Sequence, residues 1–423
     1  MNLADFLSES GGAFETPRSL YIHIPFCSSR CSYCDFHSFP CSSLSASLRA
    51  EYVEKLLRRA EVFRLAMSAP IETIFIGGGT PTVLEDEVFG RLLRGIRALA
   101  DQAPLEWTVE ANPESLSPEK LEMLVVNGVT RLSVGIQSMD DGELAMLGRH
   151  ARAADNRRAI ALAAQSGLDL SADLMTALPA RRSTGSLAGG SSLADSIGFL
   201  AENGVGHISV YDLVVEDGTP IKKRLDEGEL LHADEDLSFD ARMSAEALLA
   251  NLGFSRYEVS NYALKGRECL HNHAYWSMNS YLGLGSGAAS TLIVADGEKA
   301  DSLGASGCLS LRVEEGEDLP AYLIDPDKEA TLTWIARKES AFEMVMMALR
   351  TSRGLDEARF EARFGLPAVG ALAKTIRTWK ERFSENGGRL RLDGPGLDIL
   401  NRILVDALDE MESGFPEAGG EVS

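Results

Sequence analysis

The sequence predicts an α/β fold, in which a partial (β/α)6 TIM-like barrel precedes a small, mostly helical, winged-helix-like C-terminal domain. Six short apolar runs rich in strand-forming residues alternate with helix-period segments between residues 19 and 265. Such alternation is typical of right-handed βαβ units with a parallel sheet. After residue 330 the order changes to helices followed by a hairpin. With 423 residues, the chain is long enough for one large domain and a smaller one.

The predicted strands comprise residues 19–24, 72–77, 106–111, 131–136, 169–174 and 207–213. One of the helices between them has both ends marked: Ser117 is its cap, Pro118 takes the first helical position, and Gly128 closes it. Six units make three-quarters of an eight-unit barrel. Because active sites of such barrels lie at the carboxyl ends of the strands, functional side chains are expected there.

The domain organisation follows from where these patterns begin and end. The stretch 181–196 is rich in Gly and Ser and predicts a flexible loop without chemistry. We expect an N-terminal tail at 1–18, the barrel at 19–265, a linker region at 266–330, the winged-helix-like domain at 331–412 and a disordered tail at 413–423.

The composition restricts the partners and the compartment. The net charge is −22, from 63 acidic and 41 basic residues, which opposes binding to nucleic acid or to anionic membrane surfaces. The winged-helix-like domain is therefore predicted to serve packing rather than DNA binding. No run of about 18 uncharged apolar residues is present, so no membrane insertion is expected. The first 19 residues lack the features of a signal peptide, and free thiols favour a reducing compartment, so we expect a cytoplasmic protein.

Three cysteines stand close together in the run HIPFCSSRCSYCDF, at Cys27, Cys31 and Cys34. Three thiolates do not complete the four-ligand set that structural zinc takes, although His23 or His37 could supply the fourth ligand. Iron–sulfur clusters also prefer four thiolates. A chance group of buried cysteines is the plain alternative. We interpret the triplet as a metal centre with one open position for a reacting ligand.

Polar or glycine residues follow four further predicted strands near their carboxyl ends. In GGGTP at 77–81 the glycines let the backbone approach a ligand, although a tight turn alone would also use them. Asp173 is a charge in an otherwise apolar run, and a buried unpaired carboxylate is costly, so it needs a partner. The candidates in this group are Gly78, Gly79, Thr80, Glu110, Gln137, Arg149 and Asp173.

The triplet, with an aromatic residue before its last cysteine, resembles the radical S-adenosylmethionine (SAM) superfamily. The resemblance implies that three thiolates hold three irons of a 4Fe–4S cluster and that the fourth iron binds the amine and carboxylate of SAM. It also implies that GGGTP holds the amino group, that Glu110 binds the ribose hydroxyls, and that Gln137 and Arg149 meet the adenosine and the carboxylate. The SAM-binding set so implied adds Tyr21 and Tyr33 to the strand-end candidates.

A closer resemblance extends over most of residues 19–262. The segments that carry it are YIHIPFCSSRCSYCDFHS, FIGGGTP, EANPESL, RLSVGIQSMDDGELAMLGR and YEVSNYA. They are similar to the oxygen-independent coproporphyrinogen III oxidase (HemN-like) family. The true oxidases carry a further cysteine two positions after the triplet, where this chain has Phe36. The heme chaperone branch, HemW, has this phenylalanine and lacks the oxidases' long N-terminal segment, for which a first strand at residue 19 leaves little room. After Asp173 the chain departs from the family, with ALPAR in place of a GLPGQ-like turn.

The segment CLHNHAYW at 269–276 resembles a heme-associated motif of the chaperone branch. A neutral imidazole of His271 can bind heme iron, and Tyr275 and Trp276 offer apolar surface to a macrocycle. Cys269 or His273 could be the ligand instead. The plain alternative is that the histidine orders a loop and the aromatic residues belong to the core.

The resemblance thus implies a heme chaperone that binds heme, a 4Fe–4S cluster and SAM, and delivers heme to respiratory membrane proteins, with a possible homodimer. The alternatives are a decarboxylating coproporphyrinogen III oxidase and a radical SAM enzyme with another substrate. Enzymatic activity stays open, but oxidase turnover is not expected. Cys41, Cys269 and Cys308 receive no role from the sequence.

Overall fold

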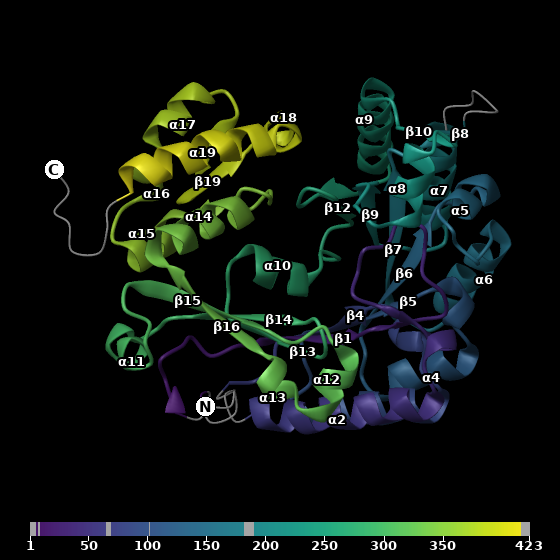
Figure 1. Cartoon of the computed structure of the whole chain (residues 1–423). Helices are drawn as coiled ribbons and strands as arrows, with labels where there is room; N and C mark the ends of the chain where they lie inside the picture. The colour runs from purple at the N-terminus through teal and green to yellow at the C-terminus, as the bar shows by residue number, and fades with distance from the viewer. Residues whose placement is uncertain (1–5, 7–8, 65–68, 101, 182–189, 416–423) are drawn as a thin grey trace.

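A computed structural model describes residue 6 and residues 9–64, 69–100, 102–181 and 190–415 (Figure 1). Among these residues, twelve strands form one sheet in the order β11-β12-β9-β7-β6-β5-β4-β1-β13-β14-β15-β16. The barrel strands are β1 (Ser19–Ile24), β4 (Thr73–Gly78), β5 (Glu106–Ala111), β6 (Arg131–Gln137), β7 (Asp169–Thr176) and β9 (His207–Asp212). Each pairs in parallel with the next, which confirms the predicted α/β barrel fold.

Helices on the outside connect these strands. They are α2 (Ala46–Arg64), α3 (Asp86–Leu99), α4 (Pro118–Val126), α5 (Asp141–Met146), α6 (Ala153–Ala163), α7 (Gly190–Glu202), α8 (Pro220–Asp226) and α9 (Glu235–Asn251). Ser117 caps α4 by accepting a hydrogen bond from the Lys120 N–H, with Pro118 at the first position, as the sequence predicts. Between β9 and α10 lie β11 (Ser255–Arg256) and β12 (Asn261–Ala263).

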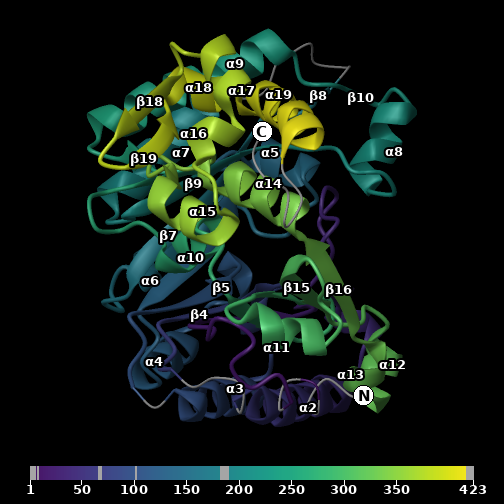
Figure 2. The same ribbon diagram turned by 90° about the vertical axis from the view of Figure 1, so that its left-hand side faces the viewer.

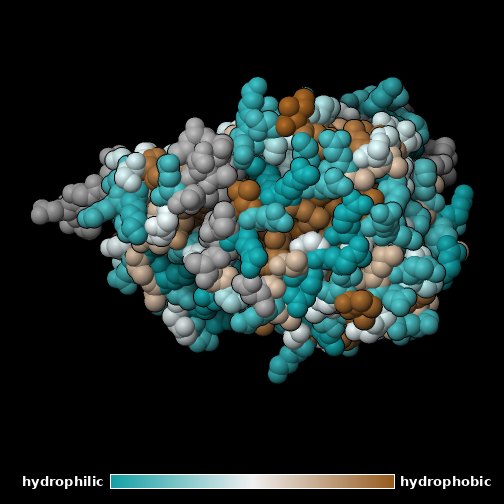
Figure 3. Space-filling view, turned by 90° about the horizontal axis from the view of Figure 1, so that it is seen from below, coloured by the Kyte–Doolittle hydropathy of each residue, from teal (hydrophilic) through white to brown (hydrophobic). Residues whose placement is uncertain are grey.

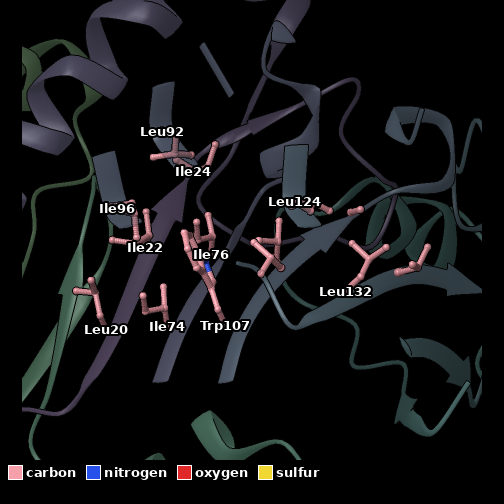
Figure 4. Packing of buried hydrophobic residues seen from close by; sticks show 14 of the residues in the cluster. Leu20, Ile22, Ile24, Ile74, Ile76, Leu92, Ile96, Trp107, Leu124 and Leu132 are labelled. Atoms are coloured by element: carbon pink, nitrogen blue, oxygen red, sulfur yellow. The ribbon is translucent and has the colours of Figure 1, made fainter. Parts of the chain in front are cut away.

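The core lies between the sheet and the helices α2, α3 and α4. Inward side chains of successive strands, such as Ile22, Ile76 and Trp107, are fully buried and pack against Leu92 and Ile96 of α3 (Figure 4). Strands buried on both faces read as continuous apolar runs, which is why the sequence located all six. This core fixes the carboxyl ends of the strands, where the candidate site residues lie.

The predicted linker at 266–330 is wrong, because this region continues the sheet. It holds α10 (Leu270–Trp276), β13 (Tyr281–Leu284), β14 (Ala289–Ile293), α11 (Gly297–Ser302), β15 (Cys308–Glu314), α12 (Leu319–Ile324) and α13 (Pro326–Glu329). β13 pairs in parallel with β1, and the following strands, including β16 (Thr331–Ala336), pair antiparallel. The sequence analysis did not predict β13 and β14, because the run YLGLGSGAAS is rich in glycine. Gly283 is needed for the close packing of this hairpin, since a Cβ there would meet the Ala289 carbonyl oxygen at 2.1 Å.

The C-terminal domain begins at residue 337 rather than 331. It contains α14 (Arg337–Ala348), β17 (Leu355–Asp356), α15 (Glu357–Phe364), α16 (Ala368–Ala371), α17 (Ala373–Thr378), β18 (Phe383–Asn386), β19 (Arg389–Leu392), α18 (Gly394–Asp398) and α19 (Leu400–Gly414). These helices, with the β18–β19 hairpin, have the predicted helical, winged-helix-like order and their own core. They lie across α10 from the barrel helices α2–α4 (Figure 2).

Three boundary predictions also differ from the structure. The predicted loop at 181–196 includes the start of α7, while 182–189 lie outside the described residues. The predicted tail at 413–423 begins within α19, whose residues through Gly414 are helical, and 416–423 are not described. The predicted N-terminal tail is packed: Phe14 stacks on Trp334 of β16 with 5.9 Å between ring centroids.

The surface is mostly polar on the side below α2, where hydrophilic side chains surround a limited hydrophobic area (Figure 3). Among the described residues, no helix combines the length and the apolar character that crossing a bilayer requires.

Candidate functional site

A cavity of about 130 Å³ opens at the carboxyl ends of β1, β4, β5, β6 and β7. All three cysteines of the triplet line it, and so do eight of the nine residues of the implied SAM-binding set. The site residues predicted from the sequence that line the cavity are Cys27, Cys31, Cys34, Tyr33, Gly78, Gly79, Thr80, Glu110, Gln137, Arg149 and Asp173. Cys27 and Asp173, which are 146 residues apart in the sequence, therefore meet at the carboxyl ends of the strands, as the parallel topology predicts.

The loop that carries the cysteines is fixed at both of its sides. It leaves the short strand β2 (Phe26–Cys27), which pairs with β3 (Phe39–Pro40). In the middle of the loop, the Ser32 N–H donates to the Leu147 carbonyl at 2.9 Å, and the Ser32 carbonyl accepts from the Ile221 N–H at 2.9 Å. The backbone of the neighbouring Gly148 has φ +70°, and a Cβ there would meet Ser32 Oγ at 2.3 Å. A glycine is thus required for this loop to dock.

Two thiols of the triplet, those of Cys27 and Cys34, sit in an environment that disfavours their charged form. Burial raises the pKa of the Cys27 thiol, and burial raises the pKa of the Cys34 thiol to about 11. A coordinating thiol is deprotonated outright by a bound metal, so these groups suit a metal centre better than a free nucleophile. All six cysteines are free thiols.

The alternative of a single zinc ion is not supported by the ligand arrangement. Within the described ranges, no three His, Cys, Asp or Glu side chains converge as the ligands of one metal ion do. His23 Nε2 is bonded to the His37 carbonyl at 2.9 Å, and His37 Nε2 to Ser286 Oγ at 3.0 Å, so neither imidazole faces the thiols as a fourth ligand. Three cysteines that line one cavity fit a 4Fe–4S cluster, in which each thiolate would bind a different iron.

The glycine turn after β4 packs on the start of the cysteine loop. The Gly79 N–H donates to the Ile24 carbonyl at 2.9 Å and the Thr80 N–H to the Phe26 carbonyl at 2.7 Å. A Cβ at Gly79 would meet the Phe26 oxygen at 2.5 Å. The glycines therefore form a tight turn. The same turn lines the cavity, so the predicted contact with a ligand is compatible with it.

Two carboxylates share the cavity floor, Glu110 from β5 and Asp173 from β7. Glu110 Oε2 accepts a hydrogen bond from the Gly78 N–H at 3.1 Å. Burial, and then the nearby Asp173 charge, raise the pKa of Glu110 to about 8, and burial also raises the pKa of Asp173. Strand β6 between them contributes Ser133, which stands opposite Glu110, and Gly135, which stands opposite Asp173. Both carboxyls are therefore protonated more readily than usual, and a bound cation would favour their charged forms.

Arg149 joins the cysteine loop to the strand ends. Its Nη2 donates to Asn112 Oδ1 at 2.8 Å and to the Gly135 carbonyl at 2.7 Å, while Nη1 approaches Cys31 Sγ at 3.6 Å. Asn112 was missed at the sequence level, although it stands in the EANP segment; its Nδ2 also donates to Thr80 Oγ1 at 2.7 Å. Gln137 has φ +65°, an unusual value for a residue with a side chain.

Tyr21 is the one predicted SAM residue outside the lining of this cavity. Its hydroxyl is bonded to His23 Nδ1 at 2.9 Å, and burial followed by the Glu110 charge raises its pKa. It therefore lies behind Glu110 rather than beside it in the cavity wall, and a direct SAM contact stays a prediction. Tyr33 lines the cavity.

The CLHNHAYW segment forms α10 at the opposite, amino end of the strands. His271 is buried, with Nδ1 bonded to Thr73 Oγ1 at 2.9 Å and Nε2 without a partner. Thr73 begins β4 and Gly78 ends it. A strand of six residues spans about 17 Å, so α10 and the cysteine cavity are separated by the length of the sheet.

A cavity of about 610 Å³ lies beside α10, and His273 lines it, whereas His271 does not. The buried His273 has an unpartnered Nε2, and burial lowers its pKa to about 4, so the imidazole is neutral. Tyr275 and Trp276 do not line this cavity; the Tyr275 ring instead packs on Tyr281 with 4.1 Å between centroids. The packing of Tyr275 agrees with the alternative in which it belongs to the core, and neither aromatic residue offers its surface to this cavity.

Comparison with known proteins agrees with this geometry. Residues 21–181 match the radical SAM superfamily, and residues 335–399 match the HemN C-terminal domain. A heme chaperone HemW of Synechocystis is 30% identical over 93% of this chain and 93% of its own length. This chain belongs to the HemW family of radical SAM proteins. The mitochondrial radical S-adenosyl methionine domain-containing protein 1 of Bos taurus is 30% identical over 94% of this chain and 89% of its own.

The fold of this HemW family member is also that of a solved structure. Coproporphyrinogen III oxidase HemN from Escherichia coli superimposes with a TM-score of 0.76 at 18% identity, over 96% of this chain and 93% of that one. Because the identity is low, this likeness concerns the fold. It covers both the barrel and the C-terminal domain.

Membership of the radical SAM superfamily implies a 4Fe–4S cluster and SAM. The residues present fit both groups, because three thiols, two carboxylates and the Arg149 guanidinium line the same cavity. When bound, a cluster held by these cysteines would supply electron-transfer chemistry to SAM. In the predicted SAM site, backbone carbonyls and the two carboxylates would be the acceptors for the SAM amine and hydroxyls, and the Arg149 guanidinium would be the donor for its carboxylate.

Proposed function

We propose that this protein is a heme chaperone, which binds heme, a 4Fe–4S cluster and SAM, and delivers heme to respiratory enzymes. The observation that carries the proposal is the separation of the two sites by the length of β4. A macrocycle held at α10 lies out of reach of a radical formed at the cysteine cavity. Relatives that match nearly the whole chain and bear the name heme chaperone support the same function.

We assign the heme to the cavity beside α10, with an imidazole of that helix as the iron ligand. His273 is the better placed residue, because it lines the cavity and its neutral ring has a free Nε2. Heme iron takes a neutral imidazole nitrogen. His271, the residue favoured by the sequence motif, also has an unpartnered Nε2, but it does not line this cavity and would reach the heme only if α10 moved.

Heme absorption in histidine variants tests this assignment. We expect His273→Ala to lose the Soret band of the heme complex, and His271→Ala to retain much of it. His232→Ala, at an exposed position, is the matched control and should bind as the parent does. A Soret band lost only in His271→Ala would transfer the ligand role to that residue. A band unchanged in both α10 variants would remove heme from α10.

The second candidate is a coproporphyrinogen III oxidase, which the fold likeness to HemN favours. Phe36 lines the cysteine cavity. It stands at the position where the oxidases that this chain resembles carry a further cysteine. Incubation of the reconstituted protein with coproporphyrinogen III, SAM and a reductant separates the two functions. Formation of protoporphyrinogen would overturn the chaperone proposal in favour of the oxidase.

The recipients of the heme, a homodimer and a cytoplasmic location belong to the same proposal. The net charge of −22 supports transfer through contact with a protein rather than with anionic lipid. Pull-down of heme-loaded protein with detergent-solubilised respiratory complexes tests the transfer, and loss of heme from the chaperone to the complex is the expected result.

A further inference from the structure

Helix α9 carries apolar side chains on two opposite faces, and the described part of the chain covers only one of them. On the inner face, Ala245 and Leu249 are buried in the barrel core, where α9 packs on α7. On the outer face, Phe239 is 46% exposed and Met243 is 37% exposed. The helix lies at the edge of the molecule in Figures 1 and 2. The function proposed above makes no use of this outer face.

The outer apolar side chains form one continuous stripe. Phe239, Met243, Ala247 and Ala250 are all exposed, and they follow one another at intervals of four, four and three positions. This spacing places them on one side of an α-helix. The outer face of a surface helix is normally polar, so the α9 stripe formed by these four residues is a surface that another segment can cover.

Carboxylates without an ion-pair partner border the α9 stripe. Asp236 and Asp240 are exposed and one helical turn apart, and Glu235 precedes them. Within the described residues, none of these three carboxylates forms an ion pair, whereas the acidic residues just before them pair with α8. Between positions 225 and 241 the chain has seven acidic residues and no Lys or Arg. The border of the stripe is therefore strongly negative.

The first cation after this acidic segment is turned away from it. Arg242 stands two positions after Asp240, which places it on nearly the opposite side of the helix. Its guanidinium lies 5.4 Å from the Phe239 ring centroid and 3.9 Å from a carboxylate oxygen of Asp398 in α18. Arg242 thus faces the C-terminal domain and leaves the carboxylates on the other side of the stripe without a counter-charge.

The apolar stripe and its charged border together select the occupant. A segment that covers the stripe must bring apolar side chains to Phe239 and Met243 and cations to Asp236 and Asp240. An amphipathic segment rich in Lys and Arg does both. A second copy of this chain is disfavoured, because each copy has a net charge of −22 and would bring the same acidic border to the contact.

We propose that the α9 stripe docks a Lys- and Arg-rich amphipathic segment of the protein that receives the heme. Cytoplasmic loops of membrane proteins carry an excess of Lys and Arg, so a respiratory membrane protein presents this chemistry next to the bilayer. The inference rests on the proposed function and deepens it, since it names the surface that holds the recipient. The docking itself requires neither heme nor the cluster.

Fluorescence anisotropy with a labelled peptide of Lys and Leu, arranged at helical spacing, tests the docking on the full-length protein. The same peptide with Glu in place of Lys is the charge control. We expect the basic peptide to bind, less tightly as salt is raised, and the acidic peptide not to bind. Phe239→Ser/Met243→Ser should weaken binding of the basic peptide at least about tenfold, because a few apolar anchors carry most of the energy of such contacts. Asp236→Asn/Asp240→Asn should weaken it and reduce its salt dependence.

Val405→Ser/Leu408→Ser is the matched control for the apolar variant. These side chains are also an exposed apolar pair on a helix, 58% and 36% exposed on α19, but Arg402 lies one turn before them. This variant should bind the basic peptide as the parent does. Unchanged binding in both α9 variants, or an equal loss in the α19 variant, would overturn the proposal. A parent dimer that Phe239→Ser/Met243→Ser converts to a monomer would also overturn it, since a second copy would then be the occupant.

The link to heme delivery has its own measurement. Heme-loaded Phe239→Ser/Met243→Ser should keep the Soret band of the parent and capture less of a detergent-solubilised respiratory complex. Equal capture by the parent and this variant would show that the recipient docks elsewhere. The heme proposal fails separately, through the Soret band of the α10 histidine variants.

Discussion

Glu106, the first residue of β5, holds His271 in place at the amino ends of the strands. Its Oε1 accepts a hydrogen bond from the His271 N–H at 3.0 Å, and its Oε2 accepts from the Leu270 N–H at 3.0 Å. The buried carboxylate thus satisfies the first N–H groups of α10, which otherwise lack partners. Together with Thr73, this side chain of β5 fixes the position of the heme-associated motif.

Glu106→Ala should lower the free energy of unfolding by about 3 kcal/mol, because it leaves two buried N–H donors without an acceptor. Glu106→Gln keeps one acceptor oxygen and should cost about half as much. Urea denaturation measures both. Glu72→Ala is the control: its exposed carboxylate pairs with Arg18 on the surface, and its loss should cost less than about 1 kcal/mol. Equal losses for the Glu106 and Glu72 variants would contradict this account.

Each cysteine of the triplet should be needed for iron. Cys27→Ser, Cys31→Ser and Cys34→Ser are expected to lose most iron and sulfide after anaerobic reconstitution, since a cluster with two thiolates is poorly held. Cys308→Ser should retain both, because Cys308 lies on β15, far from the cavity lining. Iron and acid-labile sulfide per chain are the measured quantities. A triplet variant with full iron would contradict the assignment.

The six barrel strands were predictable because each is a short buried apolar run, and the positions after them were predictable because parallel strands end at one edge. Gln137 and Asp173 met Cys27 for that reason. Asn112 was missed because its bond to Arg149 is a long-range contact that no local pattern marks.

The sequence also could not predict which end of the barrel α10 would cover. That depends on Glu106 and Thr73, which lie about 165 and 198 positions before their partners. Likewise, the exposure of a histidine in HNHAYW depends on which face of α10 meets β4. The motif indicated His271, whereas the packing leaves His273 at the cavity.

The raised pKa of Glu110 predicts a pH dependence of stability in the SAM-free protein. Between its ordinary value of 4.5 and about 8, the folded state binds more protons than the unfolded state. The contribution of Glu110 to the free energy of unfolding is therefore present at low pH and is lost as the pH rises through about 8. Glu110→Gln mimics the neutral form, so it should unfold like the parent near pH 5 and be more stable above pH 8. Thermal unfolding across this range checks the sign. A variant that is less stable at high pH would contradict the raised pKa.

Arg149 should matter for SAM more than for the cluster. Arg149→Met removes the guanidinium that bonds Asn112 and Gly135, and it should weaken SAM binding at least about tenfold, since a charge-assisted bond to the SAM carboxylate is lost. Calorimetric titration with SAM measures the change, with iron content as a check on the cluster. Arg152→Gln is the control, because that side chain is 73% exposed. Unchanged SAM affinity in Arg149→Met would remove it from the SAM site.

Docking of the cysteine loop depends on the missing side chain of Gly148, and an alanine pair isolates that effect. Gly148 and Gly167 have φ +70° and +78°, so alanine costs about 1–2 kcal/mol of backbone strain at either position. Only at Gly148 does the new Cβ meet another residue, Ser32 Oγ at 2.3 Å and the Ser32 nitrogen at 2.9 Å, whereas nothing lies within 4 Å at Gly167. Gly148→Ala should therefore displace the loop and lower the retained iron. Gly167→Ala should lose similar stability from strain and keep its iron. Equal iron in the two variants would show that the loop holds the cluster without this contact.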